Sequence, residues 1–256
     1  MNAKIGIIGL GRLGSALARG LDRSGHGGGL YGYSRTAAKA RALAAQVPTL
    51  QLCAGEAEVL RECDLVFLWT KPPDAIQVLQ SNRDLIRERR PLLVTCVIGV
   101  PLAQCTDRWA ECLPNVNMPV RQGVSALNFP ADLGEADRQL VTAALASVGT
   151  VYLLPAGEIS FYSALCSCGP ALYATMLECL ADTLAARRGY NRALCRQMVR
   201  ETVRGTVDLQ DLDGADAAEI VRRVAHPGGP SEAGVAHLRS ALPAMYEAML
   251  KHMHKW

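Results

Sequence analysis

A glycine pattern near the start of the chain has the spacing of a phosphate-binding loop. Gly9-Leu10-Gly11-Arg12-Leu13-Gly14 follows the apolar run 4–8 and opens segment 12–23, whose leucines recur at helical spacing. In such loops the first glycine makes the tight turn, the second lets backbone approach a pyrophosphate, and the third lets the helix pack against the strand. The helix start offers free N–H groups and partial positive charge to the phosphates. The pattern predicts dinucleotide binding; a glycine-rich turn without a ligand is the alternative.

The end of the second predicted strand bears on the choice of dinucleotide. Folds that bind NAD commonly place an acidic residue there, where it binds the ribose 2′-hydroxyl. This chain has no acid at that point and has Ser34-Arg35-Thr36 instead. A guanidinium matches phosphate geometry and stays charged, so an Arg flanked by hydroxyls suits a 2′-phosphate. We therefore predict NADP as the cofactor, and a solvated Arg at a helix start is the alternative.

The first part of the chain alternates between strand and helix patterns. The run Leu65 to Trp69 is continuously apolar, as expected of a buried parallel strand. Such alternation implies right-handed crossovers and a parallel sheet with helices on both faces. Segment 113–127 has no regular pattern and is interpreted as irregular. Strands are predicted at 4–8, 30–33, 65–69, 92–97 and 150–154, and helices at 12–23, 37–45 and 135–147.

The strand patterns end at Pro155-Ala156-Gly157, which is the best linker in the sequence. Residues 158–253 have the pattern of successive helices, and Gly169-Pro170 has the character of a helix start. Breaks are expected at 189–191, 213–214 and 226–230. The predicted fold class is α/β: a Rossmann-type parallel sheet domain over 1–155, followed by an all-α domain over 156–256.

Composition excludes several classes of partner. The net charge of +3 is too small to indicate nucleic acid, and the positive charge is mostly Arg scattered between acids. No apolar run reaches the roughly 20 residues needed to span a bilayer. The segment MNAKIGIIGL leads into a strand with no small-residue cleavage site after it. We expect a cytoplasmic protein that binds neither nucleic acid nor membrane.

The chain contains nine cysteines, an odd number. A disulfide framework would suit a short secreted chain rather than this one. Cys166 and Cys168 form a Cys-x-Cys pair, but a metal site would need two more ligands at a plausible spacing. The only paired histidines are His252 and His254, near the end of the sequence. We predict reduced, mostly buried thiols and no metal site.

Several stretches, in order, resemble the pyrroline-5-carboxylate reductase family. They span almost the whole chain, and the last two are the most specific, since other Rossmann proteins lack them. The stretches are DLVFL at 64–68 with Lys71-Pro72 (family DVVFLAVKP), VIGVPL at 97–102 (AAGVSL), LPN at 113–115 (MPN), ALCSCGPA at 164–171 (ALSGSGPA) and HPGGPSEAG at 226–234 (SPGGTTIAG).

This resemblance implies an enzyme that passes hydride from NADPH to the C=N carbon of a small-molecule imine, a cyclic imine carboxylate. The substrate it implies first is 1-pyrroline-5-carboxylate, and the product is then proline. In the family the helical domain interlocks with that of a second copy. The resemblance therefore implies a homodimer, or a higher oligomer of dimers, with active sites between the nucleotide-binding domain of one subunit and helices of the dimer. Because the cofactor supplies the hydride, the protein mainly positions and polarises.

The same resemblance assigns roles to residues. Ser231 stands where the family has a Thr hydroxyl near the ring nitrogen, so we expect it to be the catalytic group; a plain N-cap is the alternative. Backbone N–H groups at the helix starts Cys168-Gly169-Pro170 and Gly228-Gly229-Pro230 are expected to hold the substrate carboxylate. His226 is a weaker candidate, because a lone His is more often a surface or capping residue. The predicted cofactor-binding set is Gly9, Leu10, Gly11, Arg12, Leu13, Gly14, Ser34, Arg35, Thr36, Thr70, Lys71 and Pro72.

The chain departs from the family most in the substrate motifs. Ser-Gly-Ser-Gly becomes 166–169 CSCG, which would strain Ser167 if that position needs a positive φ. Thr-Thr becomes Pro230-Ser231, and the proline lacks an N–H. Two further functions stay open: an imine reductase with another substrate in a specialised pathway, and a non-catalytic NADP-binding protein. Hydroxyacid dehydrogenases are disfavoured, because they usually carry a Lys in the second domain and none lies between positions 71 and 251. Other departures lie at 54–56, 116–117 and 239–241.

Overall fold

The computed structural model describes residues 2–97, 100–155, 157–159, 162 and 165–253. The chain divides into two compact units, Met1–Pro170 and Ala171–Trp256. Parts of the family-like stretches at 97–102 and 164–171, one residue of the predicted linker and His254 lie outside the described residues.

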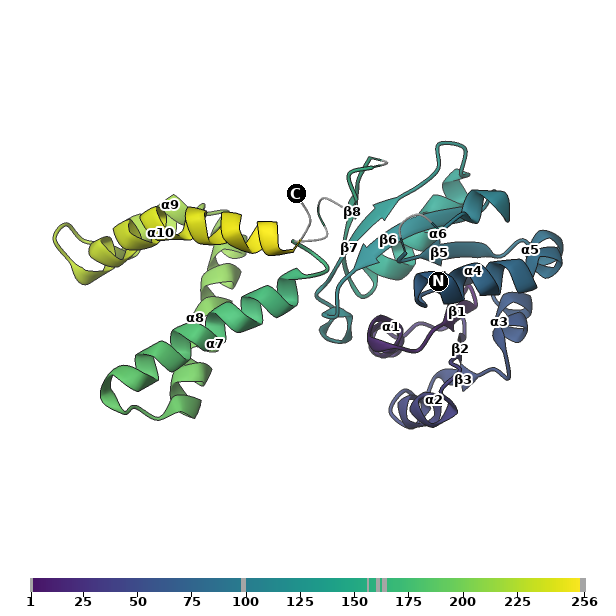
Figure 1. Cartoon of the computed structure of the whole chain (residues 1–256), viewed down its shortest axis with the longest axis horizontal. Coiled ribbons are helices and arrows are strands. Elements are labelled where there is room, and N and C mark those ends of the chain that lie inside the picture. Colours follow the sequence, from purple (N-terminus) through teal and green to yellow (C-terminus); the bar gives the residue numbers. More distant parts are fainter. Residues whose placement is uncertain (1, 98–99, 156, 160–161, 163–164, 254–256) are drawn as a thin grey trace. The chain divides into compact units, whose positions relative to one another are not determined.

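The first unit contains a sheet in the order β3-β2-β1-β4-β5-β6-β7-β8 (Figure 1). Strands β3 through β6 are parallel, β7 runs antiparallel to β6, and β8 is parallel to β7. The order of the first six strands is that of a doubly wound nucleotide-binding sheet, so the predicted fold class is confirmed for this unit. The strands are β1 (Ile5–Ile8), β2 (Leu30–Tyr33), β3 (Leu50–Leu52), β4 (Leu65–Leu68), β5 (Leu92–Thr95), β6 (Trp109–Pro114), β7 (Gly123–Asn128) and β8 (Gly149–Leu153).

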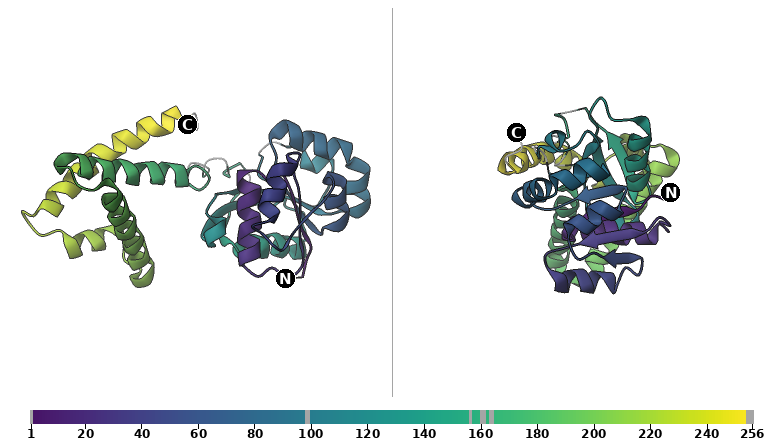
Figure 2. Two further views of the ribbon diagram at one scale, coloured as in Figure 1. Left: turned by 90° about the horizontal axis from the view of Figure 1, so that it is seen from below. Right: turned by 90° about the vertical axis from the view of Figure 1, so that its right-hand side faces the viewer.

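Helices cover both faces of this sheet (Figure 2). Helices α1, α2 and α6 bury apolar side chains on one face, where Leu17 and Phe67 are fully buried. Helices α3, α4 and α5 cover the other face, where Leu68 and Leu79 are buried. Full burial of one such side chain stabilises the fold by about 1.5–3 kcal/mol. The helices are α1 (Arg12–Arg23), α2 (Ala37–Ala44), α3 (Glu56–Glu62), α4 (Pro72–Ser81), α5 (Arg83–Arg89) and α6 (Glu135–Ala146), with short 3₁₀ turns η1 (Leu102–Gln104) and η2 (Met118–Val120).

The interpretation of 113–127 as irregular was wrong. The segment contains the end of β6 and most of β7, which pair with each other. Its polar residues make the connection between the two strands. The buried Asn115 side chain accepts hydrogen bonds through Oδ1 from the N–H groups of Asn117, at 3.1 Å, and Val124, at 3.2 Å. Asn115 therefore stabilises the turn.

Every described element of the second unit is a helix: α7 (Gly169–Arg188, which starts at the end of the first unit), α8 (Arg192–Asp213), α9 (Ala217–Val224) and α10 (Pro230–His252). The predicted breaks between them are confirmed. Side chains cap two of the helix starts: Asn191 accepts from the N–H of Leu194 and Asp216 from that of Glu219. Among the described helices, none combines the length and apolar character that crossing a membrane requires.

The predicted domain boundary between residues 155 and 156 stays a prediction. Beyond it, Ile159 and Cys166 pack with Ala126 of β7 in a small buried cluster. The compact units themselves divide later, between Pro170 and Ala171.

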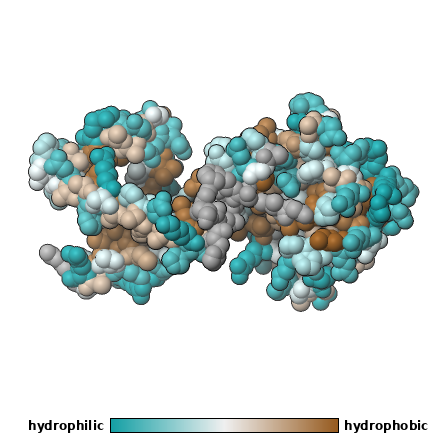
Figure 3. All heavy atoms as spheres, turned by 45° about the horizontal axis from the view of Figure 1, so that its top comes forward, coloured by the Kyte–Doolittle hydropathy of each residue, from teal (hydrophilic) through white to brown (hydrophobic). Residues whose placement is uncertain are grey.

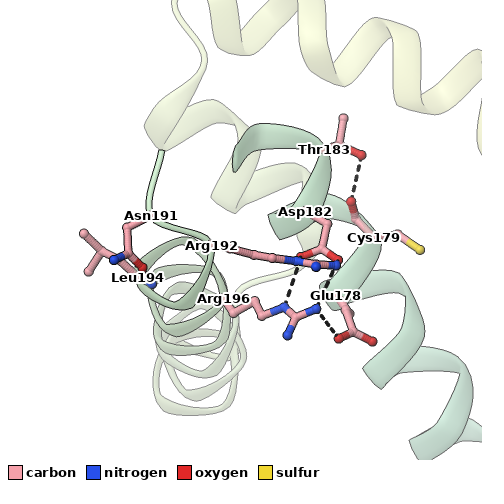
Figure 4. Close-up of polar contacts among 8 residues, drawn as sticks. All are labelled: Glu178, Cys179, Asp182, Thr183, Asn191, Arg192, Leu194 and Arg196. Atoms are coloured by element: carbon pink, nitrogen blue, oxygen red, sulfur yellow. Dashed lines mark hydrogen bonds and ion pairs between the residues drawn. The ribbon is translucent and has the colours of Figure 1, made fainter. Parts of the chain in front are cut away.

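An ion-pair network joins α7 to α8, and its side chains converge on Asp182 (Figure 4). The Asp182 carboxylate accepts hydrogen bonds from Nε of Arg192 at 2.6 Å and Nε of Arg196 at 3.0 Å. Arg196 also contacts Glu178 at 2.5 Å. Hydrogen bonds from Arg192 and Arg196 hold the pKa of Asp182 well below its usual range. A carboxyl with a lowered pKa stabilises the folded state above its unfolded pKa, and this contribution is lost as pH falls through the folded value.

Asp182→Asn removes the charge that both guanidinium groups contact. We expect a lower Tm at neutral pH and a smaller further loss of Tm below about pH 4, because the variant has no carboxyl there to protonate. Thermal unfolding of the full chain, followed by circular dichroism over a pH series, measures both. The matched control is Glu247→Gln, whose exposed pair with Lys251 spans 3.8 Å and should contribute little. Equal acid sensitivity of Asp182→Asn and the unchanged chain would contradict the prediction.

Candidate functional site

A cleft of about 830 Å³ lies at the carboxyl ends of the central strands. Its walls come from the loops that follow β1, β2 and β4, and Cys96, just after β5, also lines it. β1 pairs with β2 on one side and with β4 on the other, so strand order reverses here. Open α/β sheets bind ligands at this switch point, because adjacent loops diverge there and leave a crevice.

The glycine loop forms the floor of the cleft, and Gly9 makes its turn. Gly9 has a φ of +105°, a conformation that side chains disfavour, and a Cβ there would lie 2.5 Å from the carbonyl oxygen of Trp69. Its N–H donates to the carbonyl oxygen of Tyr33 over 2.9 Å. The Leu10 side chain is buried in the core, and the Ser15 hydroxyl donates to the Leu10 carbonyl oxygen over 3.1 Å. The loop is therefore held by contacts on both sides.

Gly11 and Gly14 differ in the space that surrounds each of them. A Cβ at Gly14 would lie 2.1 Å from the carbonyl oxygen of Gly9, so glycine is required for α1 to pack on the loop. A Cβ at Gly11 would meet no protein atom within 4 Å. Gly11 is also the N-cap of α1, with φ −78°. The protein's own packing does not require glycine at Gly11, which is consistent with a phosphate approaching the backbone there.

One end of the cleft, beside β2, is basic. The Ser34 hydroxyl accepts from the N–H of Thr36 at 3.4 Å, which shapes the turn before α2. Arg35 and Lys39 both line the cleft and are exposed. Arg35 pairs with Asp74 in the first turn of α4 at 2.6 Å, while Lys39 has no ion-pair partner within the described part of the chain. Neither Lys39 nor Asp74 was predicted from the sequence, although the place of Lys39 in the first turn of α2, shortly after Arg35, was an available signal.

The other end of the cleft lies at the ends of β4 and β5. Lys71 is the N-cap of α4 and lines the cleft beside Thr70. Trp69, just after β4, is buried, and its Nε1 has no hydrogen-bond partner among the residues that the structure describes. Burial raises the pKa of the Cys96 thiol to about 11, so it stays protonated at neutral pH. This end is less polar than the end beside β2.

All of the predicted cofactor-binding residues line the cleft except Gly14, which packs beneath the loop, and Pro72, in the first turn of α4. Four basic side chains and two acidic ones contribute to the lining, which leaves it net positive. An anionic ligand suits that balance. The lining residues that sequence reasoning did not predict include Lys39, Glu56, Trp69, Asp74 and Cys96.

Ser231 and the Gly228 turn lie at the start of α10 in the second unit. Gly229 is the N-cap and Pro230 occupies the first turn, so the alternative reading of Ser231 as the N-cap is wrong. The N–H of Gly228 donates to Oε2 of Glu232 at 2.8 Å, and that of Gly229 donates to the carbonyl oxygen of His226 at 2.9 Å. Both predicted N–H donors thus have acceptors within the chain.

The Cys168-Gly169-Pro170 segment starts α7 as expected. Cys168 is half-buried and Gly169 is buried. Among the described non-glycine residues only Arg90 and Arg121 have a positive φ, so Ser167 does not carry the strain considered above. The nearby Cys166 thiol donates to the carbonyl oxygen of Tyr162. No group of three or more His, Cys, Asp or Glu side chains suited to a metal ion occurs among the residues that the structure describes.

Two sequence families match the chain, one in each half. The family described as pyrroline-5-carboxylate reductase dimerisation matches residues 157–255, and the family described as NADP oxidoreductase, coenzyme F420-dependent, matches residues 4–98. Pyrroline-5-carboxylate reductase of Pseudomonas aeruginosa is 25% identical over 240 residues, covering 91% of this chain and 87% of the relative. That of Methanosarcina acetivorans is 26% identical over 252 residues, covering 94% and 91%.

Residues 157–255 are a pyrroline-5-carboxylate reductase dimerisation domain, and reductases of that name align with nearly the whole chain. Solved structures agree on the fold. The enzyme from Coxiella burnetii superposes with a TM-score of 0.85 at 20% identity, covering 98% of this chain and 94% of that one. Pyrroline carboxylate reductase of Plasmodium falciparum, solved with NADP bound, gives 0.82 at 22% identity, covering 99% and 95%. A reductive aminase from Aspergillus terreus gives 0.58 at 19% identity, covering 83% and 76%.

The contrast between Gly11 and Gly14 yields a paired prediction. Gly11→Ala should lower the free energy of unfolding by no more than about 1 kcal/mol, because the new methyl meets no protein atom and only the preference of an N-cap for glycine over alanine is lost. It should weaken NADPH binding by about tenfold or more, because the methyl occupies the phosphate's approach. Gly14→Ala should instead destabilise the fold by about 1–3 kcal/mol through overpacking.

Denaturant unfolding and NADPH fluorescence titration measure the two effects separately. Unchanged nucleotide affinity in Gly11→Ala would show that the loop does not hold the phosphates.

Proposed function

We propose that this chain is an NADPH-dependent reductase of a cyclic imine carboxylate, with 1-pyrroline-5-carboxylate as the substrate and proline as the product. One observation carries the proposal: a phosphate-binding loop opens a cleft with a basic end, in a chain whose residues 157–255 match the pyrroline-5-carboxylate reductase dimerisation family. Relatives of that name align over about nine-tenths of the chain. A reaction at the C=N bond therefore accounts for both halves of the sequence.

The residues of the cleft fit NADPH. The N-terminus of α1 and the Gly11 backbone suit the pyrophosphate. Arg35 and Lys39, beside Thr36, would hold the 2′-phosphate, since charged donors bind phosphate oxygens strongly. Lys71, at the other end, lies where the nicotinamide ribose would come. These assignments explain why the acid common at the end of β2 in NAD-binding folds is absent here.

The reaction requires little covalent chemistry from the protein. Bound NADPH supplies the hydride, and the protein orients the imine and keeps its nitrogen polarised or protonated. The half-buried Ser231 hydroxyl, in the first turn of α10, would hydrogen-bond the ring nitrogen or orient its proton donor. The N–H groups of Gly228 and Gly229 already donate to acceptors within the chain. The N–H groups of Ser231 and Glu232 would therefore donate hydrogen bonds to the substrate carboxylate.

A second candidate function is reduction of an imine other than 1-pyrroline-5-carboxylate. The contact between Glu232 and the Gly228 N–H favours it, because this carboxylate occupies a donor that a substrate carboxylate would otherwise use. Pro230 removes a further donor from the same turn. Both features reduce the anion-binding capacity of the helix start. A substrate without a carboxylate would lose nothing at such a site.

The helical unit is proposed to form a homodimer, or a higher assembly of dimers. Its match is to a dimerisation family, and the described parts of α8, α9 and α10 bury no side chain fully. Tyr173, Leu180 and Leu184 lie along one side of α7 with 52%, 50% and 48% exposure. Figure 3 shows apolar side chains gathered among the polar ones on the face of the molecule that it draws. Apolar surface of this extent marks an interface, and a second copy is the occupant we propose.

The reductase function is tested by following NADPH oxidation with 1-pyrroline-5-carboxylate. We expect turnover, and we expect Ser231→Ala to lower kcat by about tenfold to a thousandfold, because a positioned hydroxyl contributes to proton transfer. Ser231→Thr is the matched control, since it keeps the hydroxyl and should keep most of the activity.

A 1-pyrroline substrate without the carboxylate separates the two candidate functions. Turnover of that compound alone would favour the second. Tight NADPH binding with no turnover of either compound would leave the non-catalytic NADP-binding function.

The dimer proposal predicts that Leu184→Glu dissociates the assembly. A charge buried against a partner's apolar face costs several kcal/mol, so the variant should sediment as a monomer at micromolar concentration. Leu52→Glu, on edge strand β3 of the first unit, replaces an equally large exposed leucine and should leave the assembly intact. Monomeric behaviour of the unchanged chain would refute the proposal.

A further inference from the structure

An ion pair ties the basic end of the cleft to a second element. Nη2 of Arg35, in the turn between β2 and α2, lies 2.6 Å from Oδ2 of Asp74, in the first turn of α4. Both residues line the cleft. The Arg35 side chain is 66% exposed, whereas that of Asp74 is 23% exposed. Asp74 is thus the more enclosed partner and Arg35 the one that reaches to it.

This pair brings together the two chemistries that distinguish the dinucleotides. A carboxylate in this region accepts a hydrogen bond from the 2′-hydroxyl of NADH, whereas an arginine binds the 2′-phosphate of NADPH. The sequence at the end of β2 has only the arginine, in Ser34-Arg35-Thr36. The fold supplies the carboxylate from a helix 39 positions further along the chain. Both recognition groups therefore meet at the basic end of the cleft.

We propose that Asp74 is a specificity-determining residue for the cofactor. Its carboxylate competes with the 2′-phosphate for Arg35 and repels it, and it accepts a hydrogen bond from the 2′-hydroxyl of NADH. The site therefore takes NADH as well as NADPH, with a smaller preference than Arg35 and Lys39 alone would give. The inference rests on the proposed function of the cleft as the NADP(H) site.

The expected size of the effect follows from the charges. A phosphate monoester carries about −1.5 to −2 charges at neutral pH, and a ligand of Arg35 would lie within several ångströms of Asp74. Because the cleft opens to solvent, the repulsion is screened and decreases with salt. Removing the Asp74 charge should then tighten NADPH binding on the order of tenfold at low ionic strength. Lys39 is untouched by the change and continues to attract the phosphate.

Asp74→Asn is the test, and fluorescence titration with NADPH and NADH, without any imine, is the measurement. We expect the ratio of NADPH to NADH affinity to rise about tenfold, with NADPH tighter and NADH weaker, and the gain to shrink at high salt. The matched control is Asp107→Asn, which breaks an exposed Arg–Asp pair of 2.7 Å with Arg90 outside the cleft. It should leave the ratio unchanged.

A second variant, Asp74→Ser, also removes the charge and suits a helix start. It should give the same rise in the affinity ratio, which shows that the effect comes from the lost charge and not from the asparagine amide. An unchanged ratio in both variants, or a fall in NADPH affinity, would overturn the inference, because Asp74 would then only orient Arg35. Failure of the proposed function gives a different result: the unchanged chain would bind neither NADPH nor 2′,5′-ADP.

Discussion

The close approach of α1 to the loop after β1 is the constraint on which the cleft depends. Gly14 has no room for a Cβ beside the Gly9 carbonyl, and Gly9 has none beside Trp69. Because these backbones touch, the N-terminus of α1 points into the crevice where strand order reverses. The basic end, the loop after β4 and the partial positive charge of the α1 N-terminus therefore all face the same cleft. A side chain at either glycine would separate these parts.

Sequence alone predicts the parts of this structure that local chemistry determines. The glycine loop, α1 and the buried strand β4 carry strong patterns. The helix breaks at 189–191 and 213–214 were predictable because glycine interrupts a helical pattern wherever it stands. Strand β3 was missed because it has only three residues. Strands β6 and β7 were missed because they form by pairing with neighbouring strands, which a local sequence pattern does not indicate. The buried Asn115 belongs to such a pairing.

The candidate site divides in the same way. The place of Arg35 in the cleft was predictable from its position after a strand, but its partner Asp74 comes from another element and only the fold brings the two together. The hydrogen bond from the Gly228 N–H to Glu232 was missed for a related reason. The resemblance to the family motif rests on the glycines, and the Glu232 carboxylate lies beyond them and folds back onto the turn. Resemblance indicates where a site lies, and the particular contacts decide what it prefers.

The anchoring of the glycine loop has a thermodynamic consequence. With the Leu10 side chain in the core, the Gly9 N–H bound to Tyr33 and the Ser15 hydroxyl bound back to the loop, folding has already fixed these backbone torsions. Ordering a free residue costs about 1–2 kcal/mol, and a nucleotide that meets this loop does not bear that entropy loss. The loop is preorganised, so binding energy from the phosphates is retained as affinity, and occupancy by a nucleotide in turn raises the melting temperature of the unit.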